Sequence, residues 1–187
     1  MKKKNSLLCL TAMLGFCVSL PAATLTFSHT WDGTEASGVV RVFRDGFPSV
    51  AGTAKAFPGV LANNPTYFFT WGFEAAPGSV ITVTPSIENT NSFLVLYDPS
   101  FSTALLGTGY LGDQGSSDIA SIFSINAPVG SQILLVAMSN TGASAIGSTI
   151  AGNVSYTALA AVPEPATAAL LGLGLGAIAL ISRRRKT

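Results

Sequence analysis

Cysteine is scarce in this chain, and its position limits what it can do. The two cysteines, Cys9 and Cys17, lie in an apolar stretch that follows three lysines and precedes the small residues "PAA". Positive charge, an apolar run and small residues in this order predict a signal peptide at residues 1–23, cleaved near Ala23. An uncleaved N-terminal anchor is the alternative. Without the signal no cysteine remains, which excludes a disulfide framework and thiol catalysis.

Charged residues are also few, and the positive ones are concentrated at the two ends of the chain. Between Thr24 and Ala161 there are three basic and eight acidic residues, which gives a formal net charge of −5. Proteins that bind nucleic acid need clustered Lys and Arg against the phosphates. We therefore expect no nucleic-acid partner.

The chain has a single histidine, His29, next to Trp31 and Asp32. One histidine without cysteine excludes a zinc site of the usual kind, and the sequence has no G-x-S-x-G motif. We interpret His29 as an ordinary surface or edge residue and predict that the protein is not an enzyme. The alternative is a hydrolase in which the fold brings a serine to His29.

Three aspartates in the turns are weak calcium candidates. Asp98 ends a predicted strand in "YDP", and Asp113 and Asp118 bracket "DQGSSD". Loops that contain Asp and Gly can supply oxygen ligands to Ca²⁺. However, the spacing matches no EF-hand, and aspartates in turns usually bond the local backbone. We predict no metal and no other cofactor.

A helical period is missing from the middle of the chain, where every pattern favours β-strands. "SVITVTP" alternates as in a sheet that is wet on one side, whereas "SFLVLYD" and "QILLVAM" are apolar throughout, as in central strands. Further predicted strands are "TLTFSHT", "GVVRVFR", "YFFTWGF", "DIASIFSI" and "GNVSYTAL". Turn clusters of Gly, Pro, Asn and Asp, "ANNPT" among them, separate these strands. Residues 24–160 are therefore predicted as an all-β, antiparallel, jelly-roll-like sandwich of about eight or nine strands.

In "YFFTWGF" four aromatic residues recur at every second position, so that all four face one side of a strand. They are Tyr67, Phe69, Trp71 and Phe73. We interpret this row as the inner face of a core strand. A sugar-stacking platform is the alternative.

Residues 67–159 resemble the pre-peptidase C-terminal type of β-sandwich found in many secreted bacterial proteins. The resemblance rests on "YFFTWGFEAAPGSVITVT", "FLVLYDPSFSTALLGTG", "GDQGSSDIASIFSINAPVGSQILLVAMSN" and "GNVSYTAL". It covers about half the chain and is one of pattern more than of invariant residues. It implies a noncatalytic accessory domain, which in some members is tied to calcium or to polymer binding.

The chain ends in three distinct parts, which together form residues 161–187. Pro163, Glu164 and Pro165 are predicted to form an extended, exposed tripeptide, because each proline fixes its own φ. Residues 166–181 carry no charge and as a helix would be about 24 Å long, which predicts a transmembrane helix. The positive residues Arg183, Arg184 and Arg185 should then stay in the cytoplasm. A plain single-pass anchor is the alternative interpretation.

This order of parts closely resembles the PEP-CTERM sorting signal of Gram-negative bacteria that make exopolysaccharide. The resemblance implies that an exosortase reads Pro163, Glu164 and Pro165. It also implies that residues 166–181 anchor the chain transiently in the inner membrane, and that Arg183, Arg184 and Arg185 retain it there. The N-terminus would lie outside and the C-terminus in the cytoplasm, before release to the cell surface or extracellular matrix.

We therefore predict a secreted, noncatalytic protein, structural or adhesive, within the exopolysaccharide matrix of a biofilm. Its expected partners are the exosortase, the inner membrane and the exopolysaccharide. The alternative is a carbohydrate- or calcium-binding module of the cell envelope.

Overall fold

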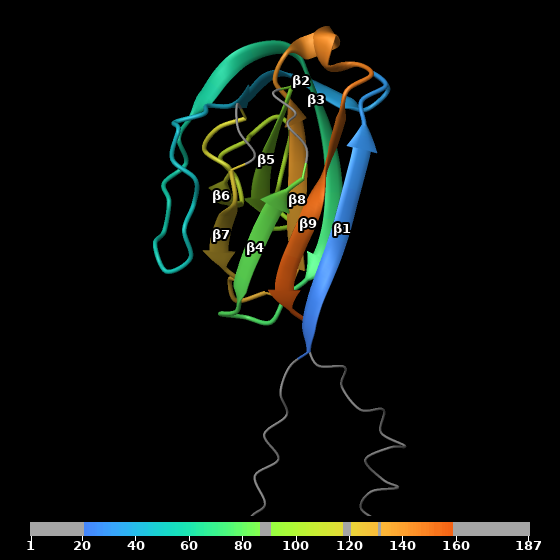
Figure 1. Ribbon diagram of the computed structural model, residues 1–187. Coiled ribbons are helices and arrows are strands. Elements are labelled where there is room, and N and C mark those ends of the chain that lie inside the picture. The colour runs from blue at the N-terminus through green and yellow to red at the C-terminus, as the bar shows by residue number, and fades with distance from the viewer. Residues whose placement is uncertain (1–20, 87–90, 118–120, 131, 159–187) are drawn as a thin grey trace, which may run out of the picture.

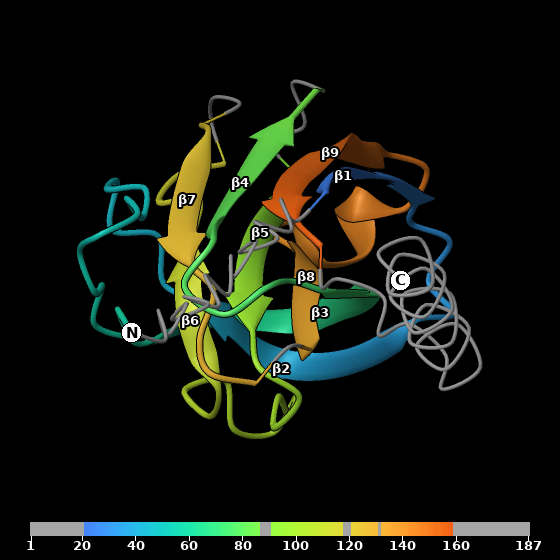
Figure 2. The ribbon, with the colours of Figure 1, turned by 90° about the horizontal axis from the view of Figure 1, so that it is seen from below.

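The structure is a computed structural model that describes residues 21–86, 91–117, 121–130 and 132–158. These ranges contain two antiparallel sheets, seen from the side in Figure 1 and from below as two layers in Figure 2. The four-stranded sheet consists, in spatial order, of β1 (Ala22–Thr30), β9 (Thr149–Thr157), β4 (Val80–Pro85) and β7 (Phe123–Asn126). The five-stranded sheet consists of β2 (Ala36–Val42), β3 (Val60–Glu74), β8 (Gln132–Ser139), β5 (Ser92–Tyr97) and β6 (Tyr110–Asp113). The predicted all-β sandwich is confirmed in these ranges.

Most connections cross from one sheet to the other. The chain crosses after β3, β4, β6, β7 and β8, and also after β1. Crossings of this kind are typical of jelly-roll sandwiches. A short 3₁₀ turn, η1 (Gly142–Ala145), lies between β8 and β9.

The main hydrophobic core lies between the two sheets. Alternate residues of the strands other than β2 point into it, as the period of two in a strand requires. Its fully buried members include Ile81 and Val83 of β4 and Leu94 and Leu96 of β5. Phe73 is buried there, while the other three rings of the β3 row are half-buried against the same cluster. The row is therefore the inner face of a core strand, as predicted.

A second hydrophobic cluster covers the outer face of the five-stranded sheet. Phe93, Val95 and Tyr97 of β5 point away from the main core and are fully buried. Loop residues cover them, among them Leu106 and Phe57. All six residues of β5 are consequently buried, which confirms that "SFLVLY" is a central strand enclosed on both faces.

Two strand predictions were wrong in detail. The segment "ANNPT" was expected to be a turn, but β3 runs through it, and Asn63 and Thr66 complete its hydrogen bonds with their side chains. Strand β6 was not predicted, because "YLGD" is short and contains a glycine. It pairs with the edge of β5 over three residue pairs, so tertiary contact decides its conformation.

None of the described segments is a helix long and apolar enough to cross a membrane. The predicted transmembrane helix at 166–181 and most of the predicted signal helix lie outside the described residues. Strand β1 begins at Ala22 and β9 ends at Thr157. Cleavage at Ala23 would thus remove the first two residues of β1.

Candidate functional site

Both ends of the described chain leave the sandwich at one pole (Figure 1). Ala22 pairs with Thr157, and Ala158 N donates to Pro21 O at 2.9 Å. Pro163, Glu164 and Pro165, together with Arg183, Arg184 and Arg185, lie outside the described residues. Five residues separate Thr157 from Pro163, so that at most about 22 Å of chain lies between them. The predicted processing motif therefore follows the end of β9 within that length of chain.

At the opposite pole, His29 lies in an aromatic cluster at the end of β1. Its ring stacks on Phe69, with centroids 3.8 Å apart and planes inclined by 14°. It also meets Trp31 edge-on at 5.0 Å. Strand β1 is an edge strand, as we expected of His29, but only 15% of the side chain is exposed.

Glu35 is the partner of His29. The imidazole Nε2 donates to Glu35 Oε1 at 2.7 Å, and the backbone N–H groups of Asp32 and Gly33 donate to the same carboxylate at 3.0 Å each. Burial alone would raise the pKa of Glu35, but these hydrogen bonds outweigh it and lower the pKa. Glu35 is therefore an ionised acceptor that fixes the loop after β1.

A pocket of about 390 Å³ opens beside this pair. Its lining is His29, Asp32, Thr34, Glu35, Ala36, Phe68, Phe69 and Thr70. Hydrogen bonds from Thr34 lower the pKa of Asp32, so both carboxylates are charged. The partner of the His29 Nε2 is a glutamate that already accepts three hydrogen bonds, and not the serine that a hydrolase would need.

A second polar cluster surrounds Asp113, which is fully buried. Lys55 Nζ donates to Asp113 Oδ1 at 2.7 Å and to Asp45 Oδ1 at 2.8 Å. Tyr110 donates its hydroxyl to the other oxygen of Asp113, and burial together with this hydrogen bond raises the pKa of Tyr110. Gly115 N adds a further donor at 2.7 Å. The cluster joins the long loop between β2 and β3 to the end of β6.

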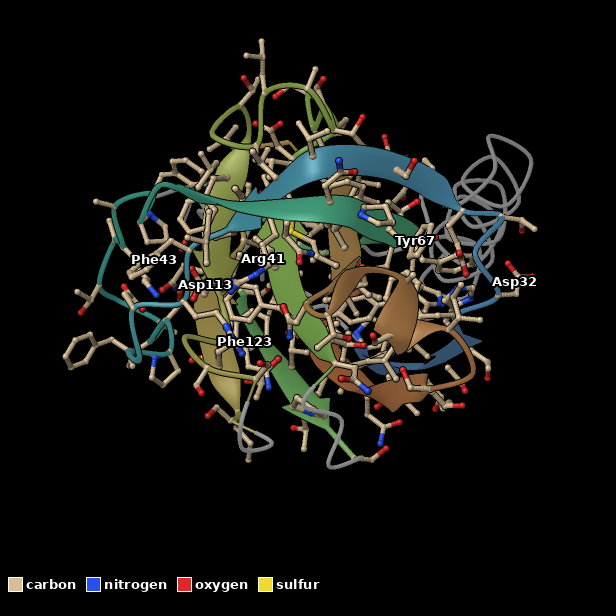
Figure 3. All side chains as sticks on the ribbon, turned by 90° about the horizontal axis from the view of Figure 1, so that it is seen from above. Asp32, Arg41, Phe43, Tyr67, Asp113 and Phe123 are labelled. Carbon is tan, nitrogen blue, oxygen red and sulfur yellow. The ribbon has the colours of Figure 1, made fainter. Side chains whose placement is uncertain are left out.

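The three calcium candidates lie in different settings. Asp113 is enclosed by the donors just described, and Asp98 accepts from Ser100 N at 2.8 Å within its own turn. Asp118 lies outside the described residues. Among the residues that the structure describes, no group of three or more His, Cys, Asp or Glu side chains could hold a metal ion. Figure 3 shows Asp113 and Asp32 on opposite sides of the molecule.

Sequence reasoning missed both polar clusters. The His29–Glu35 pair joins positions six residues apart across the end of β1, and the Lys55–Asp113 pair joins positions 58 residues apart. The nearness of Glu35 to the only histidine was a signal for the first pair. No signal existed for the second, because only the crossing of the loop over β6 brings the two residues together.

Comparison with known protein families finds the PEP-CTERM protein-sorting motif at residues 161–186. The motif implies export and a membrane-anchored C-terminal sorting signal that an exosortase processes. The resemblance of residues 67–159 to the pre-peptidase C-terminal domain is not confirmed by this comparison. No curated protein and no solved structure is significantly similar to the chain.

Proposed function

We propose that this chain is an exported, noncatalytic β-sandwich, and that after exosortase processing it acts as a structural or adhesive component of an exopolysaccharide matrix. The observation that carries the proposal is the PEP-CTERM motif at residues 161–186. The cargo delivered by this motif is the sandwich, whose last strand ends at Thr157, six residues before Pro163.

The proposed topology places the sandwich outside and the arginines at 183–185 in the cytoplasm, with residues 166–181 as a transient anchor in the inner membrane. The common exit of both chain ends at one pole supports this arrangement. A signal peptide and an anchor that leave from the same pole let the domain stand away from the membrane. After cleavage the sandwich would reach the cell surface or the extracellular matrix of a Gram-negative bacterium.

A noncatalytic role is consistent with the two polar clusters. In the first, Glu35 holds His29 and orders a loop. In the second, Lys55 and Asp113 neutralise each other inside the protein. In both, hydrogen bonds within the protein engage the titratable groups, whereas a catalytic base must reach a proton of the substrate.

Intact-mass spectrometry of the protein from the envelope and the medium of an exosortase-bearing host tests the sorting step. We expect a C-terminus between Pro163 and Ala166, with any attached lipid or glycan visible as added mass. The double variant Pro163→Ala/Pro165→Ala should accumulate in the membrane uncleaved. The matched control is Pro77→Ala in an exposed turn of the sandwich, which should be processed normally. A wild-type product that ends at Thr187 would contradict the proposal.

The matrix role needs its own test. A strain that lacks the protein is expected to lose more polysaccharide from its cells into the medium than the parent strain does. Complementation with the Pro77→Ala control should restore retention, and complementation with the uncleaved double variant should not. Equal retention in all strains would contradict the matrix role and leave the sorting step untouched.

A further inference from the structure

The outer face of the four-stranded sheet contrasts with that of the five-stranded sheet, which loops bury at β5. Each strand of this sheet alternates between core residues and residues that point outward. The outward side chains of β1 and β9 are Ala22, Thr24, Thr26, Ser28, Thr30, Thr149, Ala151, Asn153, Ser155 and Thr157. Those of β4 and β7 are Val80, Thr82, Thr84, Ser124 and Asn126. Hydroxyl groups therefore dominate this face.

Charge is absent from this sheet. The sequences of its four strands contain no Asp, Glu, Lys or Arg. The domain nevertheless has a formal net charge of −5, and its described charged residues lie in loops or in the five-stranded sheet. Exposed faces of soluble proteins normally mix charges of both signs. The exposed strands of this face therefore carry no Asp, Glu, Lys or Arg, in a domain whose charged residues are few.

The face is also uncovered. In Figure 1 strands β4, β9 and β1 lie at the front, with no described segment over them. Thr24, Thr26, Ser28 and Thr30 are all exposed, as are Thr84, Asn153 and Ser155. Only the margin at β7 is occupied, where Ala51 N donates to Ser124 Oγ at 3.0 Å. The open surface therefore consists of β1, β9 and β4.

The strand register orders these side chains into rows. Ser155 pairs with Thr24 on one side and with Thr82 on the other, which gives a row across three strands. Asn153 likewise lies between Thr26 and Thr84 in the next row. Neighbours within a row are about 5 Å apart, and successive rows about 6.7 Å apart. A regular grid of hydroxyl groups matches a ligand that itself repeats, namely a polymer.

Cross-strand hydrogen bonds hold part of the grid in place. Thr26 Oγ1 donates to Asn153 Oδ1 at 2.9 Å, and the hydroxyls of Thr30 and Thr149 are 2.7 Å apart. Side chains ordered before binding lose less conformational entropy when a ligand arrives. Each hydroxyl can both donate and accept, as a sugar hydroxyl can.

We infer that this face, through Thr24, Thr26, Thr82, Thr84, Asn153 and Ser155, binds a neutral polysaccharide along its chain. The inference deepens the proposed matrix role and rests on it. Charge complementarity selects the ligand, because an uncharged face buries no unpaired charge against an uncharged polymer. An anionic polymer would gain nothing here and would be repelled by the net negative domain.

Binding measurements on the exported form of the full chain test the inference. The probes are microcrystalline cellulose, dextran and the neutral and anionic fractions of the host's own matrix polysaccharide. We expect binding to at least the neutral matrix fraction, unchanged between about 0.05 and 0.5 M NaCl, because no charge lies on the face. The variant Thr24→Val/Thr82→Val/Thr84→Val retains the side-chain shape and removes three hydroxyls, and should bind about tenfold or more weakly.

Two further variants test whether a loss of binding is specific to this face. Ser155→Asp places one charge in the middle of the grid and should abolish binding. The matched control Ser37→Ala/Thr70→Val removes exposed hydroxyls from the five-stranded sheet and should bind as the wild type does. Circular dichroism verifies that each variant is folded.

Three results would overturn the inference. They are failure to bind any neutral probe, equal binding by the triple variant and the wild type, and binding confined to the anionic fraction and lost in salt. Self-association that the triple variant abolishes would identify the face as a contact between copies instead. If the protein is cleaved at the sorting motif but does not bind neutral polysaccharide, the binding inference fails and the sorting proposal is unaffected. If the protein is not cleaved but binds neutral polysaccharide, the sorting proposal fails and the binding inference is unaffected.

Discussion

The two sheets of this sandwich are built by the same alternation but use their outer faces differently. In the five-stranded sheet the outward residues of β5 are Phe93, Val95 and Tyr97, and loops bury them completely. In the four-stranded sheet the corresponding positions of β4 are Thr82, which is half-buried, and Thr84, which is exposed. Burial of the first face stabilises the fold. We expect the second face to contribute little to stability, and we propose it as a binding surface.

The largest effect on stability should come from replacing a large buried side chain by alanine. One such substitution in each hydrophobic cluster allows the two clusters to be compared. Phe123 belongs to the main core and Phe93 to the loop-covered cluster, and both are at most 1% exposed. Because both rings are fully enclosed, Phe123→Ala and Phe93→Ala should each lower the free energy of unfolding by about 3–5 kcal/mol. Urea titration measures both values. If Phe93→Ala lowers the free energy of unfolding by less than about 1 kcal/mol while Phe123→Ala has the expected effect, the loop-covered cluster does not act as a hydrophobic core.

The next largest effect concerns the ion pair between Lys55 and Asp113. Lys55→Met leaves the fully buried Asp113 carboxylate without its cation, and we expect a loss of about 3 kcal/mol of unfolding free energy. The double variant Lys55→Met/Asp113→Asn removes both charges and should recover part of the loss. The same urea titration applies. If the single and double variants are equally unstable, the charge of Asp113 is not the cause.

A smaller effect is expected at the end of β1, in the four-stranded sheet. The pKa of Glu35 is lowered from its ordinary value of 4.5, so the unfolded state binds its proton first as the pH falls. The stability from Glu35 is therefore complete above pH 4.5 and is lost as the pH drops through the folded-state pKa. Glu35→Gln should cost about 1.5 kcal/mol at pH 7 and flatten the pH dependence below 4.5.

The control for this prediction is Glu74→Gln, at an exposed position of β3. Its unfolding free energy at pH 7 should equal that of the wild type, because the side chain is exposed. If the pH profile of Glu35→Gln is as steep as that of the wild type, another group causes the acid sensitivity. Asp45 is one such group: burial alone would raise its pKa, but hydrogen bonds from Lys55 and Phe47 outweigh burial and lower the pKa.

The smallest effect should come from the open face. Thr24→Val, Thr82→Val and Thr84→Val should each change the free energy of unfolding by less than about 0.5 kcal/mol, because exposed strand positions tolerate β-branched replacements. Thermal unfolding of the three variants measures this. A loss of more than about 1.5 kcal/mol of unfolding free energy would mean that the hydroxyl grid stabilises the sheet. Both outer faces would then contribute to stability.

Several features of the fold were predictable because they depend on local pattern. The alternation of Ile81 and Val83 with Thr82 and Thr84 predicted one wet face, and the unbroken run in β5 predicted a strand buried on both. The limits of prediction lay where distant segments meet. Strand β6 and the passage of β3 through Pro65 depend on pairing with neighbours that the local sequence does not reveal.

The candidate site divides in the same way. The sorting motif is a linear signal, read in order from Pro163 to Arg185, and the sequence by itself determined it. The sequence likewise determined the all-β class, because periodicity is a property of successive residues. Only the tertiary structure decided which threonines share a face and which carboxylate meets His29 or Lys55. The physical reason is that strand register and sheet order join residues across long stretches of chain, and no local preference specifies them.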